Sequence, residues 1–400
     1  MSTLEAKYGL PAEVRFCKRC VVSNQRPSST VEFKNTNRKE TVHFDEEGIC
    51  SACRYHERKW GGIDWDARQR QLVELLDRHR SRDGSYDVIV PGSGGKDSTY
   101  VSHVLKYKYG MHPLTVTWPP HMYTDIGRIN FDAWLDTGLD NISFHPNRRV
   151  HRILTREAFV NLVHPFQPFI LGQKQIGPKI AAKYGVKLIM YGESQAEGGT
   201  NVAEADNPVM NPKYYTLPRD QRRDVRLGGR TVAELAELGV PAHELEPYFP
   251  IAREDAAAAG LEVHHMGFYE QWIPQEKFYY AAEHCGFQPN PVRTEGTYSK
   301  YPSLDDKIDG FHYYTTFIKF GIGRATYDAA QEIRNRHLVR EEGVALVHKY
   351  DGEFPKRYFE EFLDYTMIDE DKFWAVIDGA RSPHLWTKDG NEWRLRHQVA

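Results

Sequence analysis

A glycine-rich run, Pro91-Gly-Ser-Gly-Gly-Lys-Asp-Ser98, has the residue types and the spacing of an anion-binding turn. The apolar stretch 86–90 before it has the pattern of a strand, and residues 99–107 after it have the pattern of a helix. In such a turn, backbone N–H groups converge on an anion at the helix N-terminus, where the helix dipole favours negative charge. Glycines allow the close approach that a Cβ would block. The run therefore predicts a phosphate-binding loop.

The loop does not have the spacing of the two most common nucleotide-binding turns. It lacks the GxxxxGK[ST] of a Walker A loop and the GxGxxG of a dinucleotide-binding fold. Instead, Ser93-Gly-Gly-Lys-Asp-Ser98 resembles the SGGxDS loop (PP-loop) of the ATP pyrophosphatases. Those enzymes split ATP into AMP and pyrophosphate while they activate a carbonyl-type oxygen. The resemblance implies a HUP-like α/β fold that uses ATP and Mg²⁺.

Two CxxC pairs near the N-terminus have the spacing of a metal site. Zn²⁺ prefers four tetrahedral ligands, and each CxxC places two thiolates on one tight turn. A site closed by four cysteines leaves no open coordination position, so its role is structural. An iron–sulfur cluster and redox thiols are the alternatives for the same residues. We expect structural Zn²⁺ bound by Cys17, Cys20, Cys50 and Cys53.

Strand and helix patterns alternate after the glycine-rich loop, which predicts a doubly wound α/β fold with a parallel sheet. In such sheets, ligands bind beyond the carboxyl ends of the strands. The loop 192–201, which follows a strand pattern, should therefore share a crevice with the glycine-rich loop. Further strands are expected at 114–118, 141–144 and 186–191, and helices at 65–80, 125–137, 148–162 and 174–184.

We expect three regions along the chain. Residues 1–62 form an N-terminal zinc module with four cysteine ligands, and residues 63–225 form the ATP-binding α/β domain. Residues 226–400 form a mostly helical C-terminal region that contributes to the substrate site. The irregular, proline-containing segment 195–225 is a candidate lid, because a reactive intermediate would need protection from water.

Composition excludes several function classes. The 400 residues carry a net charge of only −3, and no basic face indicates nucleic acid as a partner. No apolar run approaches the roughly 18 residues of a membrane span, and the first residues lack the apolar core of a signal peptide. We therefore expect a cytoplasmic protein with no membrane and no nucleic-acid partner.

A second cluster of chemical groups lies at residues 295–309, which contain hydroxyls, two lysines and four carboxylates. Lys300 and Lys307 could neutralise phosphates, and Asp305 and Asp306 could hold Mg²⁺. The alternative interpretation is an ordinary helix N-cap at Ser303 or Asp305. Downstream, three polar residues on otherwise aromatic helices suggest a lined cavity: His312, Lys319 and Arg324.

Taken together, these motifs resemble the N-acetyl sugar amidotransferases of the WbpG/PseA family. The matching blocks are Cys17–Cys20, 93–98, 114–127, 191–193 and 295–324, and the likeness spans most of the chain. The block 295–324 makes the resemblance specific, since many families share the PP-loop.

The resemblance implies that an acetamido group on a nucleotide-linked N-acetyl sugar becomes an acetamidino group. ATP would adenylate the amide oxygen, and ammonia would then displace AMP. It also implies a role in the biosynthesis of lipopolysaccharide O-antigen or nonulosonic acids. Ammonia would come from a separate HisH-like glutaminase, with a HisF-like subunit as a further companion. The sequence agrees in one respect, because it contains no recognisable glutaminase domain of its own.

Candidate residues follow from the loop and from this resemblance. The nucleotide-binding set is Pro91, Gly92, Ser93, Gly94, Gly95, Lys96, Asp97, Ser98, Thr117, Trp118 and Gly192. The catalytic set is Lys96, Asp97, Glu193, Lys300, Asp306 and Lys307. The substrate set is Tyr298, Ser299, His312, Lys319 and Arg324, and the Mg²⁺ ligands are Asp97 and Asp305. Glu193 would bind Mg²⁺ or deprotonate the incoming ammonium, and the backbone around Thr117 and Trp118 would hold the adenine.

Three rival functions share some of these features. A tRNA-thiolating PP-loop enzyme would need cysteines near the nucleotide, and only Cys285 remains after the zinc ligands. A conventional amide synthetase would use the same loop to activate a carboxylate. A zinc-containing scaffold would leave both the glycine-rich loop and the block 295–324 unexplained.

Overall fold

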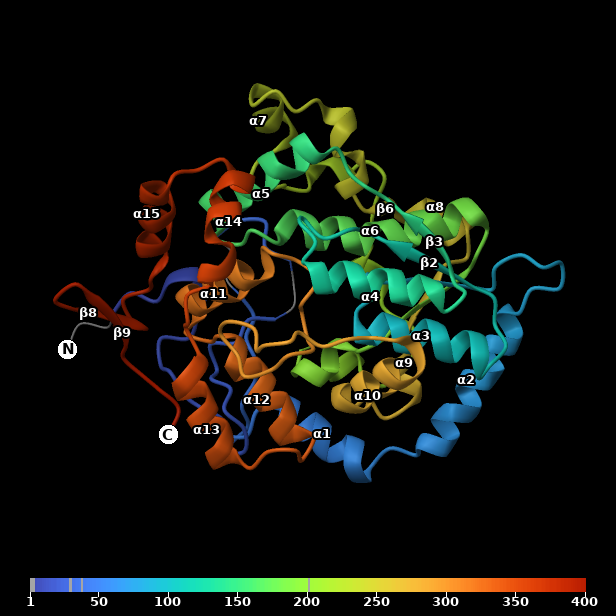
Figure 1. Cartoon of the computed structure of the whole chain (residues 1–400), viewed down its shortest axis with the longest axis horizontal. Coiled ribbons are helices and arrows are strands. Elements are labelled where there is room, and N and C mark those ends of the chain that lie inside the picture. Colours follow the sequence, from blue (N-terminus) through green and yellow to red (C-terminus); the bar gives the residue numbers. More distant parts are fainter. Residues whose placement is uncertain (1–3, 29–30, 37–38, 201) are drawn as a thin grey trace.

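The computed structural model describes residues 4–28, 31–36, 39–200 and 202–400. At its centre is a sheet of five parallel strands in the order β3-β2-β1-β4-β7 (Figure 1). The predicted doubly wound parallel sheet is therefore confirmed. The strands are β1 (Val88–Pro91), β2 (Pro113–Thr117), β3 (Asp140–Ser143), β4 (Leu188–Tyr191) and β7 (Glu262–His265).

Helices cover both faces of the sheet, which explains why β1 and β2 are buried throughout. Leu72, Val101 and Trp272 belong to the core on one face, and Ile153 and Ile176 belong to the core on the other. The first face carries α2 (Trp65–His79), α3 (Lys96–Tyr107), α9 (Met266–Tyr269) and α10 (Pro274–Cys285), with α4 (Asp125–Asp136) beside α3. The second face carries α5 (Arg148–Leu162), α6 (Gln167–Tyr184) and α8 (Arg253–Ala258).

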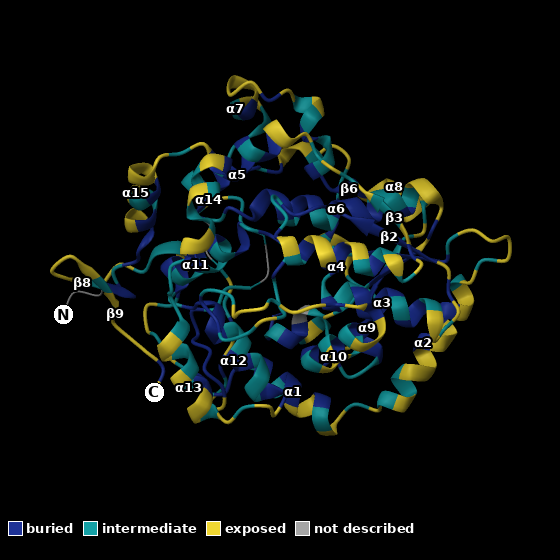
Figure 2. Cartoon of the chain, in the orientation of Figure 1, coloured by how far each residue is buried: buried dark blue, intermediate teal, exposed yellow. Residues whose placement is uncertain are grey.

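Burial follows these layers. In Figure 2 the sheet is dark blue, whereas the outward faces of α2 and α4 are yellow. The edge strand β3 has no fully buried residue, because it lacks a neighbour on one side.

The C-terminal region is mostly helical, as expected. Gly321 adopts a left-handed φ of 65° and ends the helix that begins at Asp309. A helix at Arg340–Tyr350 was not anticipated. The elements are α11 (Asp309–Phe320), α12 (Arg324–Arg334), α13 (Arg340–Tyr350), α14 (Phe359–Thr366), α15 (Glu370–Ala380) and the hairpin β8 (Trp386–Asp389) and β9 (Glu392–Leu395).

The three expected regions interlock. The strand β7 extends the central sheet beyond residue 225, the expected end of the α/β domain. The N-terminal segment shares one apolar core with α12 and α13, in which Val21 packs with Ala329 and Ala330. Figure 1 shows this blue segment running among the orange helices. In the described part of the chain, no helix combines the length and the apolar character needed to cross a membrane.

The remaining segments are short. In its described residues, the segment 195–225 forms only short 3-10 helices and the strand β5 (Thr216–Leu217), which pairs with β6 (Ile251–Ala252). One further helix, α7 (Val232–Glu237), begins with a capping box formed by Thr231 and Glu234. A last helix, α1 (Ser51–Gly61), starts directly after Cys50.

Candidate active site

The glycine-rich loop has the predicted strand–loop–helix geometry, since β1 ends at Pro91 and α3 begins at Lys96. Two of its glycines have no room for a side chain. A Cβ on Gly92 would lie 2.2 Å from Cβ of Ser98, and a Cβ on Gly94, whose φ is +84°, would lie 2.7 Å from Cα of Phe131. The loop is therefore held close to the N-terminus of α3 and to α4. Its backbone N–H groups are placed to face an anion.

A cavity of about 750 Å³, the first cavity, opens beside this loop. All three regions of the chain line it. The N-terminal segment contributes Arg26, Glu32 and Lys39. From the α/β domain come Ser93, Gly94, Gly95, Lys96, Asp97, Lys174 and Glu193, and from the C-terminal region come Asp305, His312 and Lys319.

Asp305 reaches the glycine-rich loop because its segment pairs with residues 121–124. The N–H of Thr124 donates to the carbonyl of Asp305 at 3.0 Å, and Lys307 N–H donates to the carbonyl of Met122 at 2.9 Å. Gly127 permits this approach, since its Cβ would lie 2.5 Å from Cα of Asp305. As a result, the Ser93 hydroxyl donates to Oδ2 of Asp305 at 2.7 Å. Burial raises the pKa of Asp305.

Asp97 is the second carboxylate at this end of the cavity. Its Oδ2 accepts from Nζ of Lys96 at 2.6 Å. Its Oδ1 is buried without a hydrogen-bond partner among the described residues. A buried carboxylate oxygen with no donor is open to a cation. The donor set of Asp97 and Asp305 consists of carboxylate oxygens, which Mg²⁺ prefers, so these residues fit the expected ion.

Glu193 lies where β4 leads into its loop, with its side chain open to the cavity space. Surrounding protein and the charges of Glu197 and Asp97 raise its pKa to about 7. Nε2 of Gln331 donates to its Oε1 at 2.8 Å. A carboxylate with such a pKa can accept a proton near neutral pH.

A buried charge cluster fixes the loop that carries Glu193. Oε2 of Glu197 accepts from Nζ of Lys59 at 2.8 Å and lies 2.9 Å from Nε2 of His56. Both partners are on α1, the helix that begins at the cysteine cluster. The Ser51 hydroxyl also donates to the carbonyl of Gly199 at 2.8 Å. The N-terminal module therefore holds the Glu193 loop against the α/β domain.

The opposite end of the first cavity is rich in lysine. Nζ of Lys319 donates to both oxygens of Glu32, at 2.8 and 2.9 Å, and Lys39 pairs with the same carboxylate. Burial lowers the pKa of Lys319 to about 8. Although burial opposes it, the charges of Lys319, His164 and Lys39 lower the pKa of Glu32 to about 2. His312 is neutral, because burial lowers its pKa to about 4.

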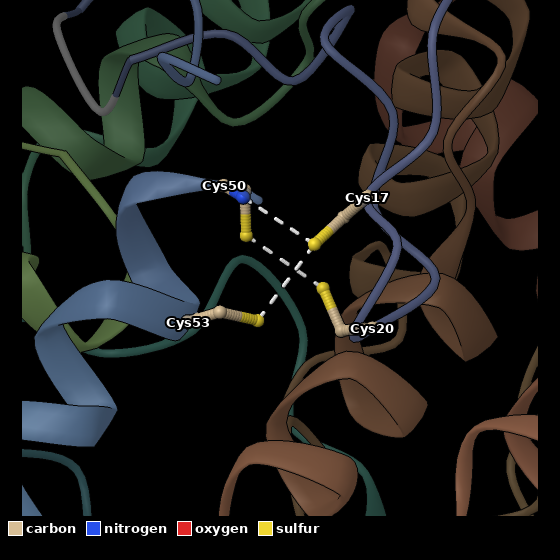
Figure 3. Close-up of side chains that lie close together, drawn as sticks. All are labelled: Cys17, Cys20, Cys50 and Cys53. Atoms are coloured by element: carbon tan, nitrogen blue, oxygen red, sulfur yellow. Dashed lines mark hydrogen bonds between the residues drawn. The ribbon is translucent and has the colours of Figure 1, made fainter. Parts of the chain in front are cut away.

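The four N-terminal cysteines form one compact cluster (Figure 3). Sγ of Cys17 and Cys53 are 3.8 Å apart, and Sγ of Cys20 and Cys50 are 3.7 Å apart. All four sulfur atoms lie within 4.8 Å of one another. Sulfurs placed about 2.3 Å from a tetrahedral Zn²⁺ would be about 3.8 Å apart, so the geometry fits zinc.

A second cavity, of about 390 Å³, touches the other side of the glycine-rich loop. Pro91, Gly92, Ser98 and Gly192 line it, together with Tyr191 and His265. Most of the predicted nucleotide-binding residues therefore lie at one or both cavities.

Thr117 and Trp118 differ, since neither lines either cavity. Trp118 is 2% exposed and stacks on Phe144 with ring centroids 5.6 Å apart. The hydroxyl of Thr117 accepts from Nδ2 of Asn141 at 2.9 Å. Core packing thus occupies both side chains, and the adenine contact expected at the backbone of this segment stays a prediction.

Asp306 points away from the cavities, unlike its neighbour Asp305. Its Oδ2 accepts from the backbone N–H of His121 and contacts Nδ1 of the same residue, both at 2.7 Å. Its Oδ1 accepts from Ile308 N–H at 2.9 Å. Asp306 therefore positions the segment that carries Asp305, and neither residue caps α11, which begins at Asp309.

Arg324 also positions this segment instead of lining a cavity. It is 2% exposed, and its Nη2 donates to the carbonyls of Pro302 and Ser303, the latter at 3.1 Å. Ser303 has a left-handed φ of 46°, which a non-glycine residue adopts only when its surroundings hold it there. Gly321 ends α11, so Arg324 lies on the next helix, α12, and does not share one helical face with His312 and Lys319.

Four further predicted residues lie outside both cavities. Lys300 is exposed and donates to the carbonyl of Pro291, and Lys307 lies 3.5 Å from Glu361. Tyr298 and Ser299 belong to the turn that precedes Lys300. Tyr298 packs against the core that the N-terminal segment shares with α12 and α13. The turn at residues 294–299 directs these side chains away from the glycine-rich loop.

Sequence reasoning missed several charged residues that line the first cavity, among them Lys174, Glu32 and Lys39. Lys174 lines both cavities from the middle of α6, and Glu32 and Lys39 come from the N-terminal segment. Local sequence carries no signal for Glu32 and Lys39. For Lys174, a signal exists in the glycines at 172 and 177, which mark close packing of its helix.

A comparison with known protein families finds a match for the C-terminal block of the chain. Residues 295–399 match the family described as "LPS biosynthesis protein WbpG-like, C-terminal domain". This part of the chain is similar to that family, which supports the expected resemblance to WbpG. No curated protein matches the chain significantly.

One solved structure that matches is the NMN synthetase from Francisella tularensis. The identity is 11%, and the match covers 71% of this chain and 96% of that chain, at a TM-score of 0.30. A match at this TM-score does not bear on the activity.

Proposed function

We propose that this chain is an ATP-dependent amidotransferase that converts the acetamido group of a nucleotide-linked N-acetyl sugar to an acetamidino group. One observation carries the proposal: the WbpG-like block supplies Asp305, whose carboxylate meets Ser93 of the glycine-rich loop at 2.7 Å. A residue from the block that matches this family thus contacts the glycine-rich loop. The corresponding pathway is lipopolysaccharide or nonulosonic acid biosynthesis.

The reaction has two steps. First, the amide oxygen attacks the α-phosphorus of ATP, an oxygen–phosphorus bond forms, and pyrophosphate leaves with the electrons of the broken P–O bond. Then ammonia attacks the imidate carbon, loses a proton, and the carbon–oxygen bond breaks to release AMP. The product carries nitrogen where the amide oxygen was.

The chain's own groups serve these steps mainly by electrostatics. Lys96 and the N–H groups of the glycine-rich loop stabilise the charge of the leaving pyrophosphate. Asp97 and Asp305 would hold Mg²⁺, which neutralises phosphate charge when bound. Glu193, with its pKa of about 7, accepts the proton that the attacking ammonia loses. Walls from all three regions limit the access of water to the adenylated intermediate.

Ammonia would come from a separate HisH-like glutaminase, with a HisF-like protein as a second companion. The nucleophile must arrive as neutral NH₃, because ammonium has no lone pair. A proton acceptor at Glu193 suits this requirement.

A tRNA-thiolating enzyme is the second candidate, and the structure disfavours it. None of the described residues that line the two cavities is a cysteine. Cys285 is buried on α10, and burial raises its pKa to about 12, which opposes thiolate formation.

Mass spectrometry tests the proposal directly. The purified chain is incubated with ATP, Mg²⁺, ammonium and a panel of UDP- and CMP-linked N-acetyl sugars. We expect a product lighter by the difference between an oxygen atom and an NH group, together with AMP and pyrophosphate. If ATP binds but every sugar stays unchanged at high ammonium, the proposal fails and tRNA becomes the next substrate to test.

A further inference from the structure

One face of α12 forms a polar wall of the first cavity. Asp328, Gln331 and Arg334 follow one another at intervals of three residues, so they share this face, and all three line the cavity. Asp328 lies near the charge of Lys96 in the glycine-rich loop, and Gln331 donates to Glu193. Arg334 lies one helical turn beyond Gln331, on the side away from Asp328. The wall therefore leads from the glycine-rich loop to an arginine.

Arg334 is a buried cation without a bonded counter-charge. It is 7% exposed. Its Nε and Nη1 are buried without a hydrogen-bond partner among the described residues, and no carboxylate in that part of the chain forms an ion pair with it. The nearby carboxylate of Glu197 is already paired with Lys59. Because burying a charge is costly unless an opposite charge pairs with it, this position calls for an anionic ligand.

A second arginine reaches the same wall from the N-terminal segment. Arg26 is partly buried, lines the first cavity and lies over the ring of Tyr327 at 4.8 Å. Its Nη2 would be 2.6 Å from a Cβ on Gly198, which places the guanidinium group beside the loop that carries Glu193. Burial lowers the pKa of Arg26, and the charge of Arg334 lowers it further, whereas Tyr327 opposes the shift. The two guanidinium groups are therefore close enough to repel each other, and no described carboxylate pairs with Arg26.

The cysteine cluster lies near both arginines. Although burial opposes it, the charges of Cys20, Cys53 and Cys50 raise the pKa of Arg334. Four thiolates with one Zn²⁺ would carry a net negative charge, which helps the fold to hold two cations together. These sulfur atoms do not accept from Nε or Nη1 of Arg334, however. The cluster therefore stabilises the cations without using up their donors.

The N-terminal module also fixes the backbone of both arginines. The N–H of Arg26 donates to the carbonyl of Ser23 at 3.2 Å, and its carbonyl accepts from Val42 N–H at 2.9 Å. Nε1 of Trp60, on α1, donates to the carbonyl of Arg334 at 3.2 Å. A fixed pair of guanidinium groups suits phosphate oxygens, because each planar fork can donate two parallel hydrogen bonds.

We propose that Arg26 and Arg334 form the subsite for the diphosphate of the nucleotide-linked sugar. This assignment rests on the proposed function and adds the residues that recognise the charge of the substrate. Two neighbouring cations match the two charges of a diphosphate ester, whereas a single phosphate or a carboxylate would leave one cation unpaired. One turn of α12, with about 5–6 Å between Cβ atoms, separates Arg334 from Gln331, the partner of Glu193. A sugar ring spans such a distance, with its diphosphate at the arginines and its acetamido group near Glu193.

Calorimetric titration of the full-length, zinc-loaded protein tests the assignment. The probes are UDP and UMP, which differ by one phosphate. The protein is first saturated with α,β-methylene-ATP and Mg²⁺, so that the glycine-rich loop is occupied. The variants are Arg334→Met and Arg26→Met, with Arg334→Lys as the form that retains the charge. Arg15→Met, at an exposed position of the same N-terminal segment, is the matched control.

We expect Arg334→Met and Arg26→Met each to weaken the binding of UDP about tenfold or more, as for loss of a charge-assisted hydrogen bond. The binding of UMP should weaken less. Arg334→Lys should be intermediate, because lysine keeps the charge but lacks the planar fork. Arg15→Met should bind UDP like the wild type. All variants should retain zinc and bind the ATP analogue normally, which shows that they fold.

Three results would overturn the assignment. If the wild type saturated with the analogue does not bind UDP, no separate diphosphate subsite exists. If both methionine variants bind UDP like the wild type, the arginines do not contact the ligand. If these variants lose zinc and bind UDP and UMP equally more weakly, the arginines serve the cysteine cluster alone. Failure of the proposed function is distinguishable, because the wild type then forms no amidine product whatever its affinity for UDP.

Discussion

The two ends of the first cavity handle buried charge in opposite ways. At the glycine-rich loop, Asp97, Asp305 and Glu193 bring three carboxylates together; burial raises the pKa of Asp305, and the surrounding protein with the charges of Glu197 and Asp97 raises that of Glu193. At the far end, Lys319 and Lys39 enclose Glu32, which stays fully ionised. At the far end, the carboxylate of Glu32 is paired with lysines of the protein itself. At the loop end, the carboxylates are available to bind a cation or to accept a proton. The difference separates a structural end from a reactive end.

Removing a lysine from the far end should give the largest effect. Lys319→Met leaves the buried Glu32 with only Lys39, and breaking a buried ion pair from one side costs roughly 3–5 kcal/mol. The lower part of that range is expected, because Lys39 remains. Urea unfolding measures the loss. The double variant Glu32→Gln/Lys319→Met should recover part of the lost free energy of unfolding. If the single and the double variant lost the same free energy, Glu32 and Lys319 would not act as a stabilising pair.

Asp305→Asn should act at the reactive end with little effect on stability. Asparagine keeps the shape and can still accept the bond from Ser93, but it removes the charge. We expect pyrophosphate release to fall about 100-fold, comparable to loss of one preorganised electrostatic group. The Mg²⁺ concentration needed for half-maximal rate should rise.

Asp306→Asn is the matched control for that prediction. Among the described residues its side chain bonds to His121, Met122 and Ile308, so the free energy of unfolding should fall by about 1–3 kcal/mol. Activity per folded molecule should change only a few-fold. If Asp306→Asn lost activity and Asp305→Asn kept it, our distinction between these neighbours would be wrong.

The pH dependence should reveal Glu193. Because its pKa is raised to about 7 and the deprotonated form is the active one, the rate should fall as the pH drops through 7. When total ammonium is adjusted to keep the NH₃ concentration constant, we expect about a fivefold loss between pH 7 and pH 6, as for one titrating base. Glu193→Gln should lower the rate and remove this limb, while Glu254→Gln, an exposed control, should keep it. If Glu193→Gln kept the acid limb of the pH–rate profile unchanged, another group would be the base that accepts the proton.

The smallest effect should come from Gln331, which donates to Glu193 at 2.8 Å. A donor favours the ionised carboxylate, so Gln331→Leu should raise the pKa of Glu193 further. The acid limb should move upward by less than about one pH unit, because a single neutral hydrogen bond contributes about 1 kcal/mol. If the acid limb of the pH–rate profile moved to lower pH instead, the hydrogen bond from Gln331 would stabilise the protonated form of Glu193.

Local patterns predicted most of the fold. The glycine-rich loop, the cysteine pairs and the strand–helix alternation depend on neighbouring residues, so the sequence displays them directly. The strand β7 was missed because His264 and His265 are not typical of a buried strand, and its pairing with β4 is not local.

The candidate site was less accessible to prediction. Asp305 and Asp306 are adjacent and chemically identical, and only the pairing with residues 121–124 decides which one faces the loop. Lys174, Glu32 and Lys39 reach the cavities through contacts between segments far apart in the chain. Such contacts depend on packing, which no local motif encodes.

The core shared by the N-terminal segment and helices α12 and α13 affects how the protein is made. Val21 and the cysteines near it share their core with Ala329 and Ala330, which are synthesised about 300 residues later. Contacts between such distant parts of a chain form slowly, and segments that wait for them stay exposed. During translation, the segment around Val21 therefore stays incompletely packed until α12 has been synthesised. A nascent chain arrested before α12 would present an apolar N-terminal segment to chaperones and proteases.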